Sequence, residues 1–310
     1  VQLAIKHAIS GRPGPAACLF RVPALKGELA EGILAKIYPI SRYLQVEKPA
    51  AFPADIDKAV EALLQARRPV IIAGNGVHAS RAYGELVKLA ELGQWPVATS
   101  YQGKSAIPEV HPLALGVMNM YGEKIALRAI SQSDLLLIVG CRLKPQDTSF
   151  ETPQLIDPRK QKIIQVDIDP RNVGWVFPVD IGLTGDAQLV MRQLIEALRE
   201  RPKGKENLDR KNWVKTIQEW KKKEGYFDDP SLHSSQVPIL STRVVKELRD
   251  ILPPETLITL DGGNNRVAML RYFLTQKPGT CFAAAGIGAM SLSVPAAIAA
   301  KLLNPQKPCV

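Results

Sequence analysis

Short runs of apolar residues recur along this sequence and alternate with stretches of helical periodicity. Val70–Ala73 and Leu135–Val139 are continuous runs, and Ile163–Val166 is interrupted only by Gln165. Such runs are typical of strands buried on both faces. Between them, apolar residues recur at helical spacing, as over 56–64. The alternation predicts an α/β fold, a doubly wound six-stranded parallel sheet covered by helices on both faces.

The same periodicities divide the chain into segments. We expect the tail of one domain over 1–30, a linker over 31–52, the six-stranded domain over 53–200, a basic linker over 201–238 and part of a second αβα domain over 239–310. A strand is expected over 16–22, and Asp55, Asp186 and Ser241 are expected to cap helices. A last strand begins near Lys307 and the sequence stops there, so we expect the last domain to be incomplete.

Cysteine and histidine usage argues against several classes of protein. The four cysteines and four histidines lie far apart, without the spacing of a disulfide framework or a metal site. Reduced thiols of a cytoplasmic protein are the expected state. No uncharged apolar run reaches the ~18 residues of a membrane span, so no membrane partner is expected.

The basic character of the chain is concentrated after residue 200. The formal net charge is +10, and much of the excess lies in 201–223. Glu206, Asp209 and Glu219 interrupt this basic stretch, and it carries no aromatic-basic RNA-binding motif. We interpret it as a solvated linker helix and expect no nucleic-acid partner, with nucleic-acid binding as the alternative.

Glycine-rich turns between a buried strand and a helix are the best candidates for a binding site. Gly74-Asn75-Gly76 has this position, and its glycines would let a phosphate approach N–H groups at a helix start. The third glycine of the dinucleotide fingerprint is missing, so a plain tight turn is an equal interpretation. Asp167 and Asp169, at the end of another strand, suit ribose hydroxyls or would cap the following turn.

Two more turns of this kind lie in the last segment. Asp261–Asn265 offers two glycines and two carboxamides, which suit a diphosphate as well as they suit a plain turn. Gly286–Met290 is also glycine-rich, and a methionine there is more often a packing residue. No Ser-His-Asp, H-E-x-x-H or P-loop pattern is present.

Five motifs occur in an order that is typical of one enzyme family. They are Gly11–Pro15, Pro69–Gly76, Asp134–Leu143, Gln165–Pro170 and Gly286–Ala300. In this order and spacing they resemble the thiamine diphosphate enzymes of the acetolactate synthase type. The resemblance covers essentially the whole chain.

The resemblance implies three αβα domains in the complete enzyme. Residues 1–30 would be the tail of the pyrimidine-binding domain, 53–200 the central nucleotide-binding-like domain, and 239–310 the N-terminal part of the diphosphate-binding domain. The catalytic glutamate would precede Val1 and the Mg²⁺ ligands would follow Val310. The resemblance therefore implies a fragment that is inactive alone.

The resemblance also assigns binding residues by position. Gly263, Asn264 and Asn265 would contact the diphosphate, Gly288 would lie beside the aminopyrimidine, and Met290 would lie beneath the bend of the cofactor. A nucleotide in the central domain, FAD as in acetolactate synthase or ADP as in oxalyl-CoA decarboxylase, would contact Gly74, Asn75, Gly76, Thr99, Gly116, Val117, Met118, Gly140, Arg142, Asp167, Ile168 and Asp169.

In chemical terms, the resemblance implies decarboxylation of a 2-keto acid such as pyruvate and formation of a C–C bond. The implied cofactors are thiamine diphosphate and Mg²⁺, and the implied assembly is a homodimer or homotetramer. Other 2-keto acid or oxalyl-CoA-type decarboxylases and aldehyde carboligases are alternatives. A free-standing nucleotide-binding regulatory module is an alternative of another class, but it would leave 239–310 unexplained.

Overall fold

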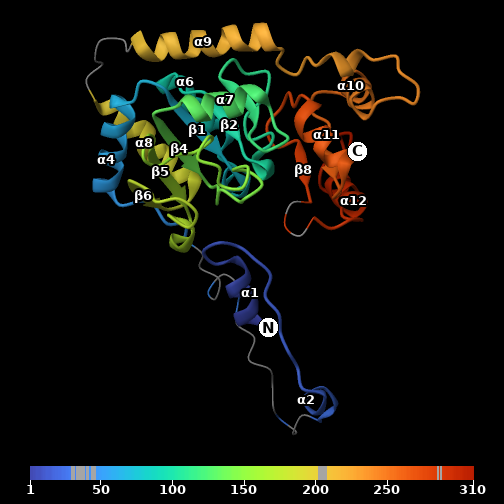
Figure 1. Cartoon of the computed structure of the whole chain (residues 1–310). Coiled ribbons are helices and arrows are strands. Elements are labelled where there is room, and N and C mark those ends of the chain that lie inside the picture. Colours follow the sequence, from blue (N-terminus) through green and yellow to red (C-terminus); the bar gives the residue numbers. More distant parts are fainter. Residues whose placement is uncertain are drawn as a thin grey trace. The chain divides into compact units, whose positions relative to one another are not determined.

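The computed structural model describes residues 1–28, 32, 39, 42, 47–201, 208–284, 286 and 288–310 (Figure 1). Contacts between residues divide the chain into two units, Val1–Pro49 and Ala50–Val310. Within the described residues, no helix is both long and apolar enough to cross a membrane.

Among the described residues of the first unit are two short helices, α1 (Gln2–Ile9) and α2 (Val22–Lys26). The strand that we expected over 16–22 is not formed, and the prediction was wrong. Residues 16–20 are extended and exposed, and no described strand pairs with them. Apolar composition alone does not make a strand, because its N–H and C=O groups need a neighbouring strand. Most of the expected linker over 31–52 lies outside the described residues.

The second unit is built around the predicted six-stranded parallel sheet. Its strands are β1 (Pro69–Ala73), β2 (Val97–Thr99), β3 (Ala114–Val117), β4 (Leu135–Val139), β5 (Lys162–Asp167) and β6 (Ile181–Thr184). The strand order is β3-β2-β1-β4-β5-β6, and every neighbouring pair is parallel. The order reverses between β1 and β4, and the carboxyl edge beside this switch point is where ligands bind in such folds.

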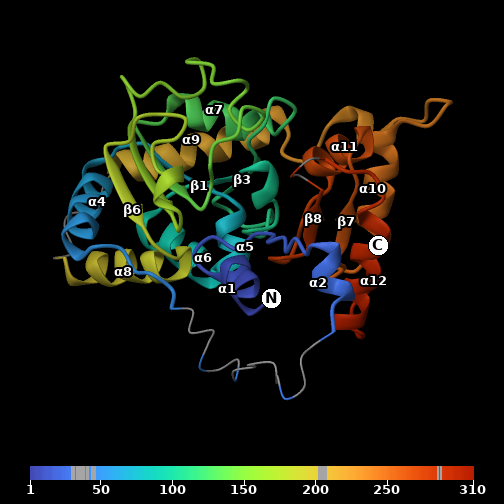
Figure 2. The same cartoon turned by 90° about the horizontal axis from the view of Figure 1, so that it is seen from below.

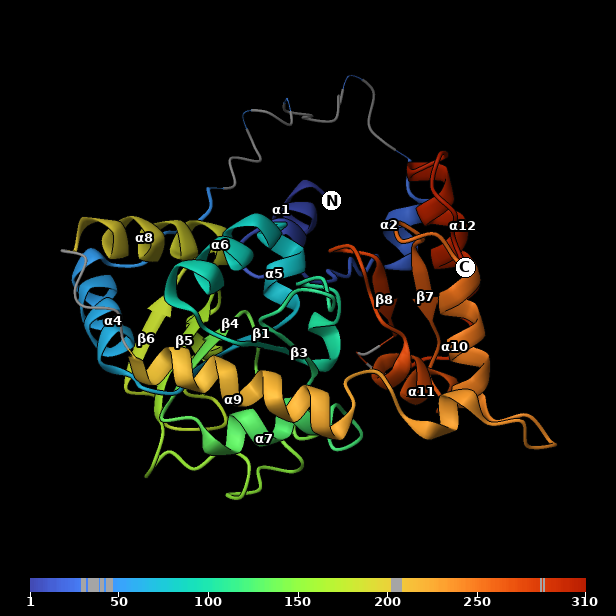
Figure 3. The ribbon, with the colours of Figure 1, turned by 90° about the horizontal axis from the view of Figure 1, so that it is seen from above.

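Helices cover both faces of this sheet (Figure 3). On one face lie α4 (Pro53–Gln65), α5 (Asn75–Ser80), α6 (Tyr83–Gly93) and α8 (Ala187–Glu200), and on the other lie α7 (Lys124–Gln132) and α9 (Leu208–Glu224). Leu135 and Leu137 pack with the first group, whereas Leu136 and Ile138 pack with the second. Alternate residues of one strand thus enter different cores, which explains why the strand is apolar throughout.

Of the three residues that we expected to cap helices, Asp55, Asp186 and Ser241, one does so. Asp186 caps α8 as predicted, because its carboxylate accepts the N–H groups of Gln188 and Leu189. Asp55 does not cap α4, which already begins at Pro53, so Asp55 lies in the first turn. The fixed φ of proline suits a first helical position and starts the helix earlier. Ser241 is likewise the first residue of α10, and Leu240 occupies the N-cap.

The basic segment after residue 207 forms a helix as we expected, but this helix is not solvated on all sides. Trp213, Ile217 and Trp220 on one face of α9 are buried in the core beneath α7. Lys221 Nζ donates to Pro112 O over 3.1 Å and also to Ala114 O at the edge strand β3. One face of this helix therefore closes the sheet, and other charged residues, such as Lys211 and Lys215, lie on its exposed face.

The remainder of the second unit contains a smaller parallel sheet, visible beside its helices in Figure 2. Its elements are α10 (Ser241–Ile251), β7 (Ile258–Leu260), α11 (Asn264–Tyr272), β8 (Cys281–Ala283) and α12 (Ser293–Leu303), and β7 pairs with β8. The expected strand near Lys307 appears as a single parallel bridge between Leu257 and Cys309. Short 3-10 turns complete the fold: η1 (Tyr101–Gly103), η2 (Pro170–Asn172) and η3 (Pro230–His233).

Candidate functional site

The turn between β7 and α11 presents two carboxamides to solvent. Gly263 is the N-cap of α11, and the side chains of Asn264 and Asn265 are exposed in the first turn of that helix. Gly263 has φ = 132°, a conformation that favours glycine. Carboxamide N–H groups beside a helix N-terminus form a donor set that suits an anion. The predicted diphosphate contacts therefore lie where such a group could reach them.

A second glycine-rich segment lies against this turn, although it is remote in sequence. The N–H of Gly262 donates to Ala289 O over 3.3 Å, and a Cβ on Gly262 would lie 2.1 Å from Gly288 O. Only glycine allows this approach. Met290, 80% exposed, follows directly. The structure thus brings the predicted pair Gly288 and Met290 to the predicted turn.

Asp261 holds these two segments together. Its carboxylate accepts the N–H of Ser291 over 3.0 Å and the N–H of Ser293 over 2.7 Å. These backbone hydrogen bonds, that of Ser293 foremost, lower the pKa of Asp261. The carboxylate therefore accepts backbone N–H groups at the start of α12 and fixes the segment that carries Met290. Sequence analysis placed Asp261 in a candidate turn but missed this role.

The glycine turn after β1 is built differently from our expectation. Gly74 N–H donates to Val139 O over 2.8 Å, and Gly76 N–H donates to Gly140 O over 2.9 Å. A Cβ on Gly76 would lie only 2.5 Å from Gly140 Cα. These glycines bring β1 and β4 close together and their N–H groups already have acceptors, so contact of a nucleotide with Gly74 and Gly76 stays a prediction and would not use these two donors. Of this turn, the exposed Asn75 remains accessible.

Asp167, the last residue of β5, and Asp169, two residues further on, are engaged in local turns. Asp167 accepts the N–H of Asp169 over 2.9 Å and Asn172 Nδ2 over 3.1 Å. Asp169 caps η2 and accepts Arg171 Nε over 2.9 Å. This matches the interpretation of both residues as turn caps. Ile168, between them, is half-buried.

The other predicted nucleotide contacts lie around the ends of β2, β3 and β4. Thr99, Val117 and Met118 have side chains in the core, so a ligand at this edge would meet their backbone. Gly116 has φ = 81°, and a Cβ there would lie 2.7 Å from Glu123 Cγ. Arg142 is partly exposed just after β4.

A buried acid beside Gly116 was not found from the sequence. Glu123 is 7% exposed at the N-cap of α7, and burial raises its pKa to about 7. Arg271 and Lys104 oppose this shift of pKa by their positive charge. Lys221 behaves in the opposite way, because burial lowers its pKa to about 8. No pattern in the sequence marks Glu123, because its burial depends on elements distant along the chain.

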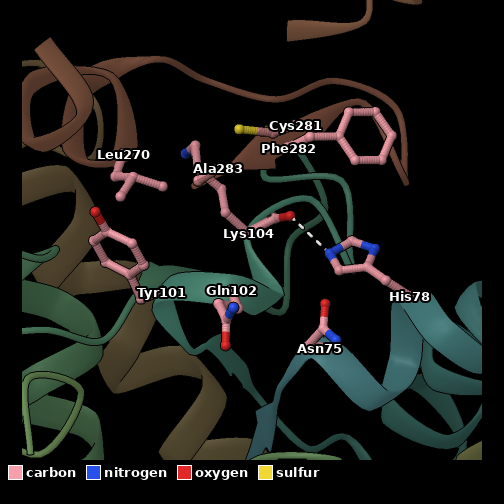
Figure 4. A pocket seen from close by; sticks show the side chains of 9 residues that line it. All are labelled: Asn75, His78, Tyr101, Gln102, Lys104, Leu270, Cys281, Phe282 and Ala283. Carbon is pink, nitrogen blue, oxygen red and sulfur yellow. Dashed lines mark hydrogen bonds between the residues drawn. The ribbon is translucent and has the colours of Figure 1, made fainter. Parts of the chain in front are cut away.

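A cavity of about 120 Å³ lies between the two sheets (Figure 4). Asn75 and His78 of α5 and Gln102 of η1 line one side, and Cys281–Ala283 of β8 line the other. His78 Nε2 lies 3.0 Å from Lys104 O, and its Nδ1 lies 3.1 Å from the hydroxyl of Tyr83. Burial lowers the pKa of His78, which favours the neutral imidazole.

The described residues were also searched for side chains that could bind a metal ion together. Over the described ranges, no group of three or more His, Cys, Asp or Glu side chains is arranged to hold a metal ion. The described cysteines are all unpaired thiols, and burial raises the pKa of Cys141 and of Cys281 to about 12.

Comparison with known proteins identifies the family. The family model "Thiamine pyrophosphate enzyme, central domain" matches residues 56–194, and "Thiamine pyrophosphate enzyme, C-terminal TPP binding domain" matches residues 261–310. The first contains the six-stranded sheet, and the second begins at the β7–α11 turn. The chain belongs to the thiamine pyrophosphate enzyme family, which confirms the resemblance found in the motifs.

Its curated relatives include acetolactate synthase subunits. The "Probable acetolactate synthase large subunit" of Methanocaldococcus jannaschii is 35% identical over 98% of this chain and 51% of that protein. The protein of the same name from Methanococcus aeolicus is 36% identical over 97% and 51%. The "Acetolactate synthase large subunit" of Corynebacterium glutamicum is 29% identical over 97% and 46%. The chain spans about half the length of these relatives.

Proposed function

We propose that this chain is part of a thiamine diphosphate-dependent enzyme of the acetolactate synthase type, which decarboxylates a 2-keto acid such as pyruvate and forms a C–C bond. One observation carries the proposal. Asp261 joins the turn with two exposed carboxamides to the segment that carries Gly288 and Met290. The names of the relatives supply the reaction type.

The residues of the β7–α11 turn fit the diphosphate of this cofactor. Asn264 and Asn265 offer N–H donors, and Gly263 leaves the backbone open at the helix N-terminus. Met290 is exposed beside them and offers an apolar contact to the thiazolium ring. When bound, thiamine diphosphate supplies the electron sink for decarboxylation, and this chain holds and orients it. Mg²⁺ would accompany the diphosphate, as it does in other phosphate-binding sites.

For the central domain we propose a different mode of nucleotide binding from the one that the motifs suggested. The glycine turn does not fit as a phosphate cradle, because Gly74 and Gly76 donate to β4. FAD or ADP would instead be held by Arg142, Asn75 and the backbone near Ile168. These positions surround the switch point of the sheet.

We further propose a cytoplasmic homodimer or homotetramer. The described cysteines are unpaired, in keeping with a reducing compartment. Apolar side chains of α12 are also exposed, with Ile298 at 58% and Leu302 at 78%. Exposed apolar faces of this kind are typical of surfaces that become covered in an assembly.

Calorimetry with thiamine diphosphate and Mg²⁺ tests the proposed function. Asn264→Ala/Asn265→Ala should weaken binding by at least about 10-fold, because each lost hydrogen bond to a charged group is worth about 1.5–3 kcal/mol and about 1.4 kcal/mol is tenfold. Asn212→Ala, on the exposed side of α9, is the matched control and should leave the Kd unchanged. Thiamine without phosphates is the chemical control, and the double variant should not alter its binding.

Two results would contradict the proposal. If the unaltered chain has no affinity for thiamine diphosphate, the site has been assigned wrongly. If the double variant binds thiamine diphosphate as tightly as the Asn212→Ala control, the carboxamides do not contact the diphosphate. A parallel titration with FAD and with ADP, comparing the unaltered chain with Arg142→Ala, tests the central domain.

A further inference from the structure

A buried set of hydrogen bonds, called the seam below, joins residues 104–109, which follow η1, to residues 275–281, which lead into β8. Glu109 accepts hydrogen bonds from the N–H of Thr275 over 2.7 Å and from its hydroxyl over 2.8 Å. The N–H of Glu109 in turn donates to Thr275 O over 2.8 Å. Two residues 166 positions apart in sequence are therefore bonded in both directions.

Glu109 is also half of a buried ion pair. Lys104 Nζ lies 2.7 Å from one carboxylate oxygen of Glu109 and 2.9 Å from the other. Lys104 is 2% exposed and Glu109 is 1% exposed. Burying two charges costs hydration, so such a pair adds little net stability, but loss of one partner leaves an uncompensated charge. The pair thus favours one arrangement of the seam and penalises alternatives.

Ser105 forms a second attachment next to the first. Its hydroxyl accepts the N–H of Thr280 over 3.2 Å and of Cys281 over 3.1 Å, and its carbonyl accepts the N–H of Gly279 over 2.9 Å. Ser105 is fully buried with φ = 66°, a left-handed conformation that is unfavourable for serine. Strain of this kind persists only where surrounding contacts determine it, and here it directs two acceptors at one segment.

The attached segment leads directly to the proposed cofactor site. Cys281 begins β8, whose Ala283 pairs with Leu260 at the end of β7 (Figure 4 shows β8 beside Lys104). β7 runs into the Gly262–Asn265 turn, and β8 runs toward Gly288 and Met290. A shift of β8 at Cys281 would therefore change the spacing between the two parts of that site.

We propose that Glu109 is a positioning residue for the thiamine diphosphate site. Acting through Thr275 and together with Ser105, it fixes β8 and hence the place of Gly288 and Met290 relative to the Gly262–Asn265 turn. The inference rests on the proposed function, because it names the residue outside the site that sets the site's geometry.

The test compares Glu109→Ala with Leu86→Ala, both in the full chain. Leu86 is fully buried in the core cluster that also contains Ala106 and Ile107, so its truncation destabilises this part of the fold without removing any hydrogen bond of Lys104, Ser105 or Glu109. At a temperature where both variants are folded, Glu109→Ala should raise the Kd for thiamine diphosphate with Mg²⁺ roughly 10-fold. Leu86→Ala should leave this Kd unchanged. A Kd that changes equally in both variants, or in neither, overturns the proposal.

Amide hydrogen exchange gives a readout that does not depend on the cofactor. The amides of 281–284 should exchange roughly 10-fold faster in Glu109→Ala than in Leu86→Ala, because local opening would become easier. If the unaltered chain does not bind thiamine diphosphate, the proposed function fails, but unequal exchange still shows the attachment. Equal exchange in the two variants overturns the attachment itself.

A rescue variant separates hydrogen bonding from charge. Lys104→Met/Glu109→Gln removes both charges at similar volume and keeps an oxygen that can accept the N–H of Thr275. Its Kd should return to within about 3-fold of the unaltered chain, since replacing a buried pair is often neutral. Failure to return overturns the role assigned to the Thr275 contact. Should Glu109→Ala not fold, Ser105→Ala removes one attachment and should shift both readouts in the same direction.

Discussion

Two glycine-rich turns of this chain follow a buried strand and open a helix, but they use their glycines differently. At Gly74–Gly76 the N–H groups donate to β4, and the backbone packs against Gly140. At Gly262–Asn265 one glycine packs against Gly288, while two carboxamides remain exposed. The same sequence pattern thus serves close packing in one region and leaves an open donor surface in the other.

This difference follows from what surrounds each turn. The first turn lies at the centre of six strands, where β4 supplies carbonyl acceptors directly beside it. The second follows β7, which pairs with β8, while Leu257, just before β7, forms a single bridge with Cys309. Substitutions in the packed region should therefore change stability, and substitutions at the open turn should change ligand binding.

The largest expected effect comes from Gly140→Ala in the packed region. Gly140 has φ = 60°, and its Cβ would lie 2.5 Å from Gly76 Cα. Backbone strain and overpacking together should lower the free energy of unfolding by about 2–5 kcal/mol, measured by chemical denaturation. Gly84→Ala in α6 is the control, since its Cβ meets nothing within 4 Å, and it should be neutral or slightly stabilising. Equal stabilities of the two variants would refute the packing role.

The next effect is a pH dependence from the packed region. Burial raises the pKa of Glu123 from 4.5 to about 7. Between these values the unfolded chain releases the proton and the folded chain keeps it, so the free energy of unfolding falls as the pH rises. Glu123→Gln lacks this fall and should be more stable than the unaltered chain by about 1–3 kcal/mol at pH ~8.

The two proteins should have nearly equal stability at pH ~4, where Glu123 is largely protonated in both the folded and the unfolded chain. Asp147 also has its pKa raised by burial, to about 7, and it contributes the same trend in both proteins. Denaturation curves across this range provide the measurement. Parallel pH profiles would show that Glu123 is solvated in the folded state.

Asp261 at the open turn should show the opposite sign and a smaller effect. The hydrogen bonds from Ser293 and Ser291 lower its pKa from 3.8. Its contribution is therefore present at neutral pH and is lost as the pH falls below 3.8 through the lowered pKa. Asp261→Asn should lower the melting temperature slightly at neutral pH, and the difference should shrink in acid. A difference that grows in acid would contradict the assignment.

The smallest effect on stability is expected at the two carboxamides. Asn264→Ala/Asn265→Ala should change the free energy of unfolding by no more than ~0.5 kcal/mol, because both side chains are exposed. Its effect should appear in thiamine diphosphate binding instead. A large loss of stability in this variant would show that the open turn also serves packing, and the contrast between the turns would disappear.

Sequence reasoning succeeded where local periodicity carries the information. The six strands and α8 with its Asp186 cap follow from apolar runs and a helix-start signal, and the structure has both. It failed for the expected strand over 16–22, where apolar residues have no partner strand in the described part of the chain. For the basic segment it predicted a helix, which α9 confirms, but it failed to predict that Trp213, Ile217 and Trp220 of this helix are buried.

In the candidate site, too, some features could be predicted from the sequence and others could not. The residues of the β7–α11 turn and of the Gly288–Met290 segment were selected from motifs, and their ligand contacts stay predictions. That the two segments meet through Asp261, and that Glu109 bonds to Thr275, could not be read from a motif. Both contacts join residues that are distant in sequence, and neither changes the local residue pattern.

The sequence by itself determined which stretches become strands and helices and which turns can approach another backbone closely, because these depend on side-chain periodicity and on the missing Cβ of glycine. Only the tertiary structure decided which glycine turn is packed and which is open. That outcome depends on whether a neighbouring strand offers its carbonyl groups, as β4 does at Gly76. The burial of Glu109 and Glu123 was decided in the same way, because desolvation arises from all the elements packed around a group.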